Sequence, residues 1–228
     1  MSQEINQKLF QDRKRTNILS NPEQKFISYL VPRVPEWVSS DGLTAIGFIG
    51  SLIILGSFLL AEYVALPWLL LGIFGFFVQW YGDSLDGRIA YYRDKSRKWY
   101  GFAIDIVMDW LSTVLIGLGY VFYASDDYKY TGFFLVALYG WAMIISQLRY
   151  KITDKYTIDA GLLGPTEIRV VICLVFLAEV LFKGSIDYLV IAICVSLFCI
   201  NIVDTKKLLD LGDLRDKEEK AKKLQENQ

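Results

Sequence analysis

The chain has 228 residues, of which 54% are hydrophobic, and a formal net charge of −1. The apolar residues are gathered in long blocks, which excludes an ordinary soluble domain and is typical of a membrane protein. Histidine is absent, so histidine metal sites, histidine general bases and Ser-His-Asp triads are excluded. The three cysteines lie in apolar blocks and favour neither a disulfide nor a metal site. We expect no nucleic-acid partner for such a chain.

Residues 1–43 are expected to form a cytoplasmic and interfacial N-terminal segment. Residues 1–25 are polar and charged, and no apolar stretch directly follows their basic cluster, so we predict no cleavable signal peptide. Residues 26–31 then mix apolar and polar side chains before two prolines. This pattern predicts either a short helix in the membrane interface, with Trp37 at headgroup depth, or a plain linker.

The apolar blocks predict an all-α fold, a polytopic bundle of about six transmembrane helices within residues 44–203. Residues 204–228 are charged and rich in helix-favouring side chains, and we expect them to form a cytoplasmic C-terminal tail. The expected spans are Thr44–Ala61, Pro67–Tyr81, Phe102–Tyr123, Tyr130–Leu148, Ile168–Phe182 and Ser185–Val203.

The basic residues are distributed unevenly between the two sides of this predicted bundle. All but two of the 24 Lys and Arg residues fall on the side of the termini, and the two exceptions are Lys129 and Lys183. Because cytoplasmic loops of membrane proteins carry an excess of basic residues, we expect both termini to be cytoplasmic. An even number of spans gives the same result.

Two pairs of aspartates stand next to apolar blocks. Asp83 and Asp86 follow the second expected span at spacing i, i+3, and Asp105 and Asp109 open the third at spacing i, i+4. Each pair projects from one helical face, and a short connection would bring both pairs together at the cytoplasmic edge of the membrane. Acids at a membrane are costly and indicate function, and carboxylates without His or Cys suit Mg²⁺ or Mn²⁺.

The stretch from residue 83 to residue 109 resembles the signature of the CDP-alcohol phosphatidyltransferase family, D-x-x-D-G-x-x-A-R followed by G-x-x-x-D-x-x-x-D. Two departures are visible: Tyr91 stands where the pattern has Arg, and the spacer of nine residues, 92–100, is one longer than the usual form. The matching positions are Asp83, Asp86, Gly87, Ala90, Gly101, Asp105 and Asp109.

The resemblance implies an integral membrane transferase of phospholipid biosynthesis that joins the phospho-alcohol group of a CDP-alcohol to an acceptor hydroxyl and releases CMP. It implies a pair of Mg²⁺ or Mn²⁺ ions held by Asp83, Asp86 and Asp105. Asp109 would take the hydroxyl proton and also touch metal. A homodimer accords with the resemblance. The CDP group would be lined by Gly87, Ala90 and Gly101.

Several further residues are candidates for binding the two substrates. Arg88 and Arg93 could supply the cation that the motif position of Tyr91 lacks. The glycines of the motif admit close approach of a ligand or of another helix, and spacing does not decide between the two. The acceptor could meet Arg149, Glu167 or Arg169, although membrane topology explains the arginines and the helix dipole explains Glu167 equally well. The identities of the CDP-alcohol and of the acceptor stay open.

Three other classes of protein compete with this interpretation. An aspartate-rich membrane prenyltransferase also uses Mg²⁺ and a diphosphate, but its acidic motifs lie on distant helices. A cation transporter also places acids in the membrane, but this leaves the Gly and Ala positions unexplained. A purely structural membrane protein has little reason to hold four acids in register. Metal-dependent release of CMP separates the first interpretation from all three.

Overall fold

The computed structural model of the chain describes residues 19–153 and 164–226, and within these residues it is all-helical, with no strand. The prediction of an all-α fold is confirmed. The short 3₁₀ helices are η1 (Val31–Arg33), η2 (Leu66–Leu70) and η3 (Asp126–Tyr128), and the α-helices are α2 (Ser20–Leu30), α3 (Ser40–Tyr63), α4 (Leu71–Tyr92), α5 (Lys98–Tyr123), α6 (Lys129–Thr153), α7 (Pro165–Leu181) and α8 (Ser185–Glu226).

Four stretches of the described chain are long and apolar enough to cross a membrane, which fits a multi-pass membrane protein: Ser40–Tyr63, Lys98–Tyr123, Asp126–Thr153 and Ser185–Gln225. The expected number of about six is therefore not confirmed. Helix α4 carries Asp83, Asp86 and Arg88 in its C-terminal half. Helix α7 has 17 residues, about 26 Å at 1.5 Å per residue, which is short of a hydrocarbon core of about 30 Å.

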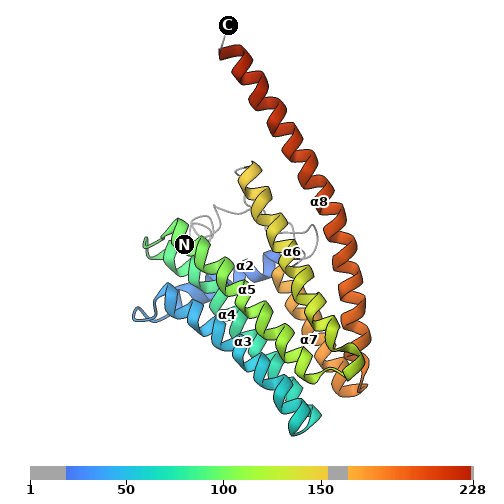
Figure 1. Ribbon diagram of the computed structural model, residues 1–228. Helices are drawn as coiled ribbons and strands as arrows, with labels where there is room; N and C mark the ends of the chain where they lie inside the picture. The colour runs from blue at the N-terminus through green and yellow to red at the C-terminus, as the bar shows by residue number, and fades with distance from the viewer. Residues whose placement is uncertain (1–18, 154–163, 227–228) are drawn as a thin grey trace.

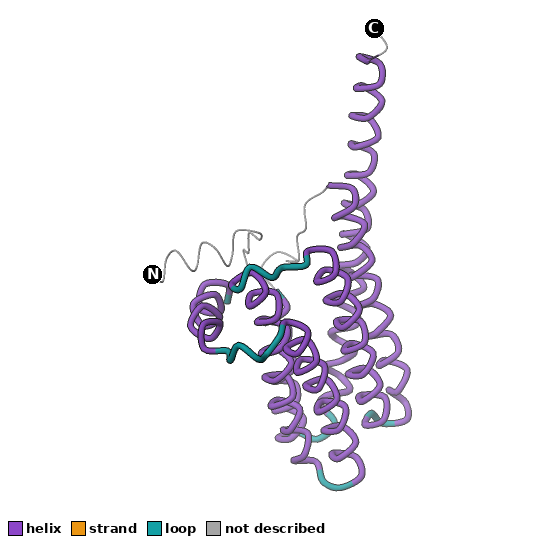
Figure 2. Tube along the Cα trace, turned by 90° about the vertical axis from the view of Figure 1, so that its left-hand side faces the viewer, coloured by secondary structure: helices purple, strands orange, loops and turns teal. Residues whose placement is uncertain are grey.

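The long helices run alternately up and down. The turns α3–α4, α5–α6 and α7–α8 all lie at the lower end of the bundle in Figure 1, whereas the α4–α5 connection and the C-terminal end of α6 lie toward the opposite end. The same arrangement is visible from the side in Figure 2. The aspartate pairs of α4 and α5 are therefore near the end of the bundle where α2 lies.

Helices α3 and α4 form a hairpin whose backbones touch. A Cβ atom added at Gly50 of α3 would clash with the backbone nitrogen of Gln79, and one added at Gly82 of α4 would clash with the backbone of Gly47. Close backbone approach through small residues is a common way for membrane helices to associate. It fixes α4 against α3 immediately before the first aspartate pair.

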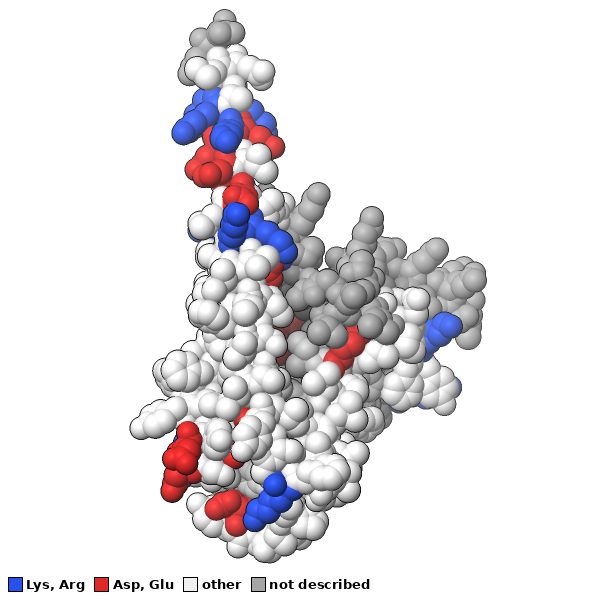
Figure 3. All heavy atoms as spheres, turned by 90° about the vertical axis from the view of Figure 1, so that its right-hand side faces the viewer, with Lys and Arg blue, Asp and Glu red and all other residues white. Residues whose placement is uncertain are grey.

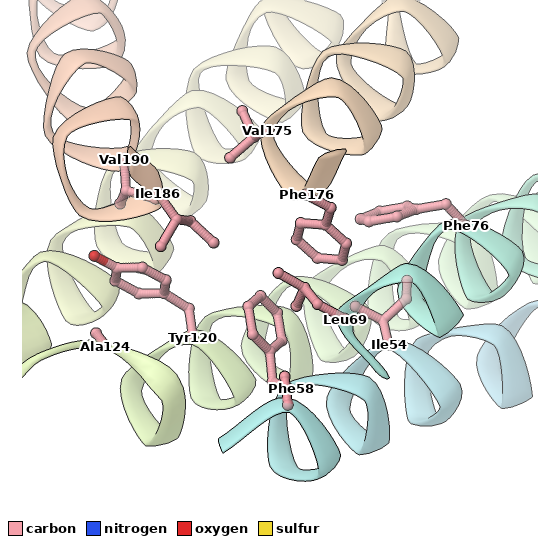
Figure 4. Close-up of a cluster of buried hydrophobic side chains, with 11 residues drawn as sticks. Ile54, Phe58, Leu69, Phe76, Tyr120, Ala124, Val175, Phe176, Ile186 and Val190 are labelled. Carbon is pink, nitrogen blue, oxygen red and sulfur yellow. The ribbon is translucent and has the colours of Figure 1, made fainter. Parts of the chain in front are cut away.

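An aromatic core joins α3, α4, α5 and α7 (Figure 4). The rings of Phe58 and Phe176 meet edge to face with centroids 5.0 Å apart, and Phe76 lies 5.8 Å from the same Phe176 ring. Tyr120 of α5 packs edge-on against Phe58 at 6.5 Å. These contacts hold α7 on the α3–α4 hairpin and so set the position of its first turn.

Helix α2 docks on the hairpin at the aspartate end. Its Ile27 is buried in a second apolar cluster with Leu85 and Ile89 of α4. Phe26 stacks on Trp80 with ring centroids 5.6 Å apart. Trp37, beyond η1, is 86% exposed, and its place at headgroup depth stays a prediction.

Helix α8 continues without a break from Ser185 to Glu226 and passes through the expected boundary between residues 203 and 204. Its last part extends beyond the bundle (Figure 1), and in Figure 3 an uncharged surface gives way along this helix to a region of mixed Lys, Arg, Asp and Glu. The sequence of this region favours helix, since it contains no proline and a single glycine. Arg215 donates to the carbonyl of Lys151 at 3.1 Å and so caps the end of α6.

Candidate functional site

The two aspartate pairs lie on either side of the α4–α5 connection. Asp83 and Asp86 belong to the C-terminal half of α4, and Asp105 and Asp109 belong to the N-terminal half of α5. The connection, residues 93–97, reverses the chain with Asp94 at φ 55°, a left-handed conformation that Asp tolerates better than most residues. A short connection therefore brings the two halves of the motif to one end of the bundle.

A pocket of about 520 Å³ opens between the first turns of α3 and α5 and the last turns of α4. Its lining also includes Ser40 and Thr44 of α3 and Tyr150 of α6. Residues from both halves of the motif meet in it, together with Arg93. Of the site residues expected from the sequence, six line this pocket: Asp86, Gly87, Ala90, Arg93, Gly101 and Asp105.

The two motif glycines face open space. Apart from its neighbours in the same helix, no residue that the structure describes would lie within 4 Å of a Cβ atom built at Gly87 or at Gly101. Packing between helices therefore does not account for either glycine, in contrast to Gly82 one turn earlier in α4. Both line the pocket, where a missing side chain lets a ligand approach the helix backbone.

Asp86 is the most enclosed of the four acids, at 4% exposure. Its carboxylate accepts hydrogen bonds from Thr44 Oγ1 at 2.7 Å and from the Gly87 N–H at 2.5 Å. Asp86 lies beyond the expected membrane span 67–81. Its burial, together with the negative charges of Asp83 and Asp105, raises its pKa to about 8. A bound cation acts in the opposite direction and favours the ionised carboxylate.

Asp83 and Asp109 both interact with the positively charged side chain of Arg169 on α7. The guanidinium Nη2 of Arg169 lies 2.5 Å from Asp83 Oδ2, and Arg169 Nε donates to Gln79 Oε1 at 3.3 Å. The charge of Asp109 also acts on Arg169. Asp109 is exposed, and the side chains of Asp83 and Arg169 retain 35% and 14% exposure. Arg169, expected from the sequence as an acceptor residue, is thus brought to the acid cluster.

The two arginines expected to replace the motif cation have different surroundings. Arg93 donates from its guanidinium to the backbone carbonyls of Val34, Pro35 and Val38 at 3.0, 2.9 and 2.5 Å. It therefore holds the segment between η1 and α3 in place, although it also lines the pocket. Arg88 is 5% exposed and does not belong to the described lining of the pocket.

The two other residues expected near the acceptor have structural contacts. Glu167 accepts from the N–H groups of Gly164 at 2.9 Å and of Leu19 at 2.7 Å, so it caps α7 and ties the chain before α2 to it. Arg149 lies 3.8 Å from Asp204 of α8, and its buried Nε has no hydrogen-bond partner among the residues that the structure describes. Neither contact tests acceptor binding, which stays a prediction for these two residues.

The chemistry of the acids fits a hard divalent cation. All four side chains offer only carboxylate oxygens, and Asp86 is buried within the field of two other carboxylates, which favours a nearby positive charge. In residues 19–153 and 164–226 no three His, Cys, Asp or Glu side chains lie close enough to hold one metal ion together. The four acids thus offer ligand atoms that suit such a cation. They are arranged as two pairs, Asp86 with Asp105 at the pocket and Asp83 with Asp109 near Arg169.

Several residues that shape the site give no signal in the sequence. Thr44 and Ser40 bind the Asp86 carboxylate and carbonyl from 42 and 46 residues away. Gln79 links Arg169 to Ser51. Ser and Thr are common at the interfaces of membrane helices, and Gln can hydrogen-bond across them, so only their position in the folded bundle assigns these residues to the site.

A comparison of the chain with models of known protein families gave no match, and neither did a comparison with curated proteins. The resemblance to CDP-alcohol phosphatidyltransferases therefore rests on the motif residues of the sequence, and membership of that family stays a prediction.

Proposed function

We propose that this protein transfers the phospho-alcohol group of a CDP-alcohol to an acceptor hydroxyl, forming a phosphodiester and releasing CMP. The observation that carries this proposal is the pocket at the ends of α4 and α5. It collects Asp86 and Asp105 with two glycines whose α-carbons face open space. A metal-binding acid pair beside bare helix backbone is suited to a diphosphate, whose oxygens need hard cations and close N–H donors.

In the reaction, the acceptor oxygen forms a bond to the phosphorus of the alcohol phosphate, and the bond from that phosphorus to the CMP oxygen breaks. Asp109, which is exposed beside the other acids, accepts the hydroxyl proton. Divalent cations, held by Asp83, Asp86 and Asp105 with Asp109 beside them, would neutralise the charge on the diphosphate. The chain supplies binding and alignment, which account for a large share of catalysis in transfer reactions of this kind.

An ordinary aspartate with a pKa near 3.9 is a weak base. Asp109 would therefore act through its position, since a weak base takes a proton only from a hydroxyl that is held against it. The pocket provides this alignment on the donor side, because Gly87, Ala90 and Gly101 place bare backbone beside the acids.

We further propose that six helices cross the membrane, with both termini and the pocket on the cytoplasmic side. The alternation of the long helices in Figure 1 supports this arrangement, as does the excess of Lys and Arg on the side of the termini. The apolar residues of η2 and of the first half of α4 would then cross together and emerge with the aspartates, and the bilayer would thin locally around the short α7.

The test is release of CMP by the purified protein in detergent, measured with Mg²⁺ or Mn²⁺ across a panel of CDP-alcohols and acceptor alcohols. We expect one donor and acceptor pair to give metal-dependent CMP release that a chelator abolishes. Asp109→Asn should lower the rate at least roughly 100-fold, the usual scale for loss of a general base.

The matched control is Asp127→Asn, an exposed aspartate of η3 at the other end of the bundle, which should leave CMP release unchanged. CMP release that is indifferent to Asp109 would remove this residue from the reaction. If the folded protein binds Mn²⁺ but releases CMP from no member of the panel, the proposal is overturned in favour of cation transport or a prenyl diphosphate substrate.

A further inference from the structure

A second pocket, of about 430 Å³, lies at the end of the bundle opposite the aspartate pairs. It opens between η3 and the turn from α7 to α8, where the chain reverses at the lower end of the bundle in Figure 1. Its volume is within the usual range of small-molecule sites. The polar and aromatic part of its lining consists of Ser125, Tyr128, Lys183, Ser185, Asp187 and Tyr188.

The second pocket lies where stretches of membrane-spanning length begin and end. Of the four stretches that are long and apolar enough to cross a membrane, one ends at Tyr123, one begins at Asp126 and one begins at Ser185. The pocket is lined by residues at and directly beside these boundaries. A chain that leaves the hydrocarbon core enters the layer of phospholipid headgroups. A headgroup is therefore the small molecule that this pocket meets at the highest concentration.

One wall of the second pocket is fixed by a buried acid. Asp187 of α8 is 4% exposed and accepts hydrogen bonds from Tyr120 Oη and from Ser125 Oγ, both at 2.9 Å. These bonds join α8 to the end of α5, because Tyr120 belongs to α5 and Ser125 lies just beyond it. A buried polar group is costly unless it is hydrogen-bonded, so the two bonds hold the carboxylate in the lining of the pocket.

The turn that carries Lys183 has a fixed shape. Gly184 has φ 91°, a conformation that residues with a side chain rarely adopt. The N–H groups of Gly184 and Ile186 donate to Glu179 at 2.9 and 2.8 Å. These two backbone donors are thus already occupied. A ligand of the pocket must be recognised by side chains, of which Lys183 is the basic one.

Lys129 and Lys183 are the two basic residues expected on this side of the bundle, and their surroundings differ. Lys129 Nζ lies 2.6 Å from Asp126 Oδ1 and does not belong to the described lining of the pocket. Lys183 lines the pocket, is exposed, and forms no ion pair with a residue that the structure describes. An ammonium group in this position can pair with the phosphate of a headgroup.

Two tyrosines of the same lining favour a cation. The rings of Tyr128 and Tyr188 meet edge to face with centroids 5.8 Å apart. Tyr188 is 67% exposed, so a large part of its ring is open. The face of a tyrosine ring attracts an ammonium group, and the carboxylate of Asp187 adds to this attraction. The lining therefore combines one group that suits a phosphate with an acid and two rings that suit an ammonium.

We propose that the second pocket binds the headgroup of a zwitterionic phospholipid, with its phosphate at Lys183 and its ammonium at Tyr188 and Asp187. Membrane proteins recognise anionic lipids through clusters of about four to eight basic residues, whereas this lining contains one lysine. An anionic headgroup has no cation to place beside Asp187, whose carboxylate would repel it. The acyl chains would lie along Leu177 and Leu181, which are exposed on α7.

The first test measures lipid binding by native mass spectrometry of the purified, delipidated full-length protein. Dioleoyl-phosphatidylethanolamine and dioleoyl-phosphatidylglycerol are titrated separately, and phosphatidylethanolamine should bind more tightly. Lys183→Gln should weaken binding of phosphatidylethanolamine roughly tenfold, the scale of a hydrogen bond to a charged group. Lys183→Arg should retain the parent affinity, because it keeps the charge. Lys129→Gln, which removes the other lysine of this end, is the control and should change nothing.

Two results of this titration overturn the proposal. One is equal affinity for phosphatidylethanolamine in the parent and in Lys183→Gln. The other is binding of phosphatidylglycerol as tight as that of phosphatidylethanolamine. Lys and Tyr also anchor helices at a membrane surface without selecting a lipid, and both results would assign Lys183 and Tyr188 to that role alone.

The second test concerns the ammonium end of the headgroup. Tyr188→Phe keeps the ring and should bind phosphatidylethanolamine as the parent does. Tyr188→Leu removes the ring face and should weaken this binding roughly threefold, the scale of an exposed cation–π contact. It should leave phosphatidylglycerol unaffected. Equal weakening of both lipids by Tyr188→Leu contradicts the proposed orientation. The Tm of each variant without lipid should equal that of the parent, since both side chains are exposed.

A lipid is further distinguished from a soluble ligand of the same chemistry. Soluble phosphoethanolamine, at the concentration of the lipid, should displace no phosphatidylethanolamine, because it lacks the acyl chains. Displacement would assign the pocket to a soluble molecule and contradict a lipid site.

The second pocket is independent of the reaction proposed at the aspartate pairs. Selective binding of phosphatidylethanolamine through Lys183, in a protein that releases no CMP, would retain the lipid site and remove the transferase. Release of CMP by a protein that binds both lipids equally would retain the transferase and remove the lipid site.

Discussion

At the scale of single residues, the glycines of α4 differ in what surrounds them. Gly82 touches the backbone of α3, whereas Gly87 faces the pocket. Gly87→Ala should therefore leave the Tm unchanged or slightly higher, since Ala favours helix over Gly by about 1 kcal/mol. It should raise the KM for the CDP-alcohol, because the new methyl group occupies space that the diphosphate would use. Thermal unfolding and CMP release measure the two effects.

Gly82→Ala is the matched comparison. Its methyl group would clash with the backbone of Gly47, so the α3–α4 hairpin must separate. We expect a loss of roughly 1–3 kcal/mol, the usual cost of overpacking, with a lower Tm. If Gly82→Ala is stable, or if Gly87→Ala unfolds the protein, the assignment of these two glycines to packing and to ligand approach is wrong.

Arg93 is expected to act on stability before it acts on substrate. Arg93→Gln removes the cation that gathers the carbonyls of Val34, Pro35 and Val38. Hydrogen bonds to charged groups contribute about 1.5–3 kcal/mol each, and in a partly exposed site we expect a total loss of about 2 kcal/mol. Denaturant unfolding in detergent measures it. An unchanged Tm with a raised KM for the CDP-alcohol would assign Arg93 to the nucleotide instead.

At the scale of helices, the turn between α7 and α8 depends on one buried acid. Glu179, 1% exposed, accepts from the N–H groups of Gly184 and Ile186 at 2.9 and 2.8 Å and from Tyr123 Oη at 2.6 Å. It caps the start of α8 from the end of the preceding helix. Glu179→Ala leaves these donors unpaired, and we expect a loss of about 3 kcal/mol.

The measurement for Glu179 is the Tm of purified protein, with Glu179→Gln as the variant that keeps an acceptor oxygen. Glu179→Gln should lose less stability than Glu179→Ala. CMP release per folded molecule should stay the same in both, because Glu179 lies at the opposite end of the bundle from the aspartate pairs. A specific loss of CMP release in stable Glu179→Gln would contradict this purely structural role.

The same scale shows what a sequence reveals about this molecule. Hydrophobic blocks predict the long helices, and helical spacing predicts that each aspartate pair shares a face, because both patterns are local. The partners of Asp86 and Asp83 lie 42 and 86 residues away, at Thr44 and Arg169, and no local pattern joins them. Glu179 has no predicted role for the same reason, since Tyr123 reaches it from another helix.

Helix α8 shows a different limit of local patterns. Hydropathy changes sharply at residue 203, whereas the backbone continues as helix to Glu226. The change in hydropathy predicts where the chain would leave the membrane. It does not predict where the helix ends, because Leu, Lys and Glu have nearly equal helix propensity.

At the scale of the whole molecule, the bundle has two parts that meet at the acids. The α3–α4 hairpin and α5 provide most of the pocket and all four aspartates, and α7 provides Arg169. The aromatic core around Phe58 and Phe176 joins these parts (Figure 4). The position of Arg169 at Asp83 thus depends on core packing remote from the pocket.

The proposed crossing of the membrane by each of the helices α3 to α8 gives the last prediction. Single cysteines are placed at Ser96, Asp127 and Leu224, all exposed, in a protein in which Cys173, Cys194 and Cys199 have been replaced. A maleimide that cannot cross membranes should label Asp127→Cys in intact cells. It should label Ser96→Cys and Leu224→Cys only after permeabilisation, because the α4–α5 connection and the end of α8 lie on the cytoplasmic side in the proposed topology.

Ser96→Cys decides the status of α4. If α4 does not cross, the α4–α5 connection stays on the outer side and Ser96→Cys is labelled in intact cells. Four crossing helices and six both leave the termini on one side, so Leu224→Cys alone cannot separate them. Labelling of Ser96→Cys from outside would also place the pocket on the outer face, where a cytoplasmic CDP-alcohol cannot reach it, and would overturn the proposed reaction together with the topology.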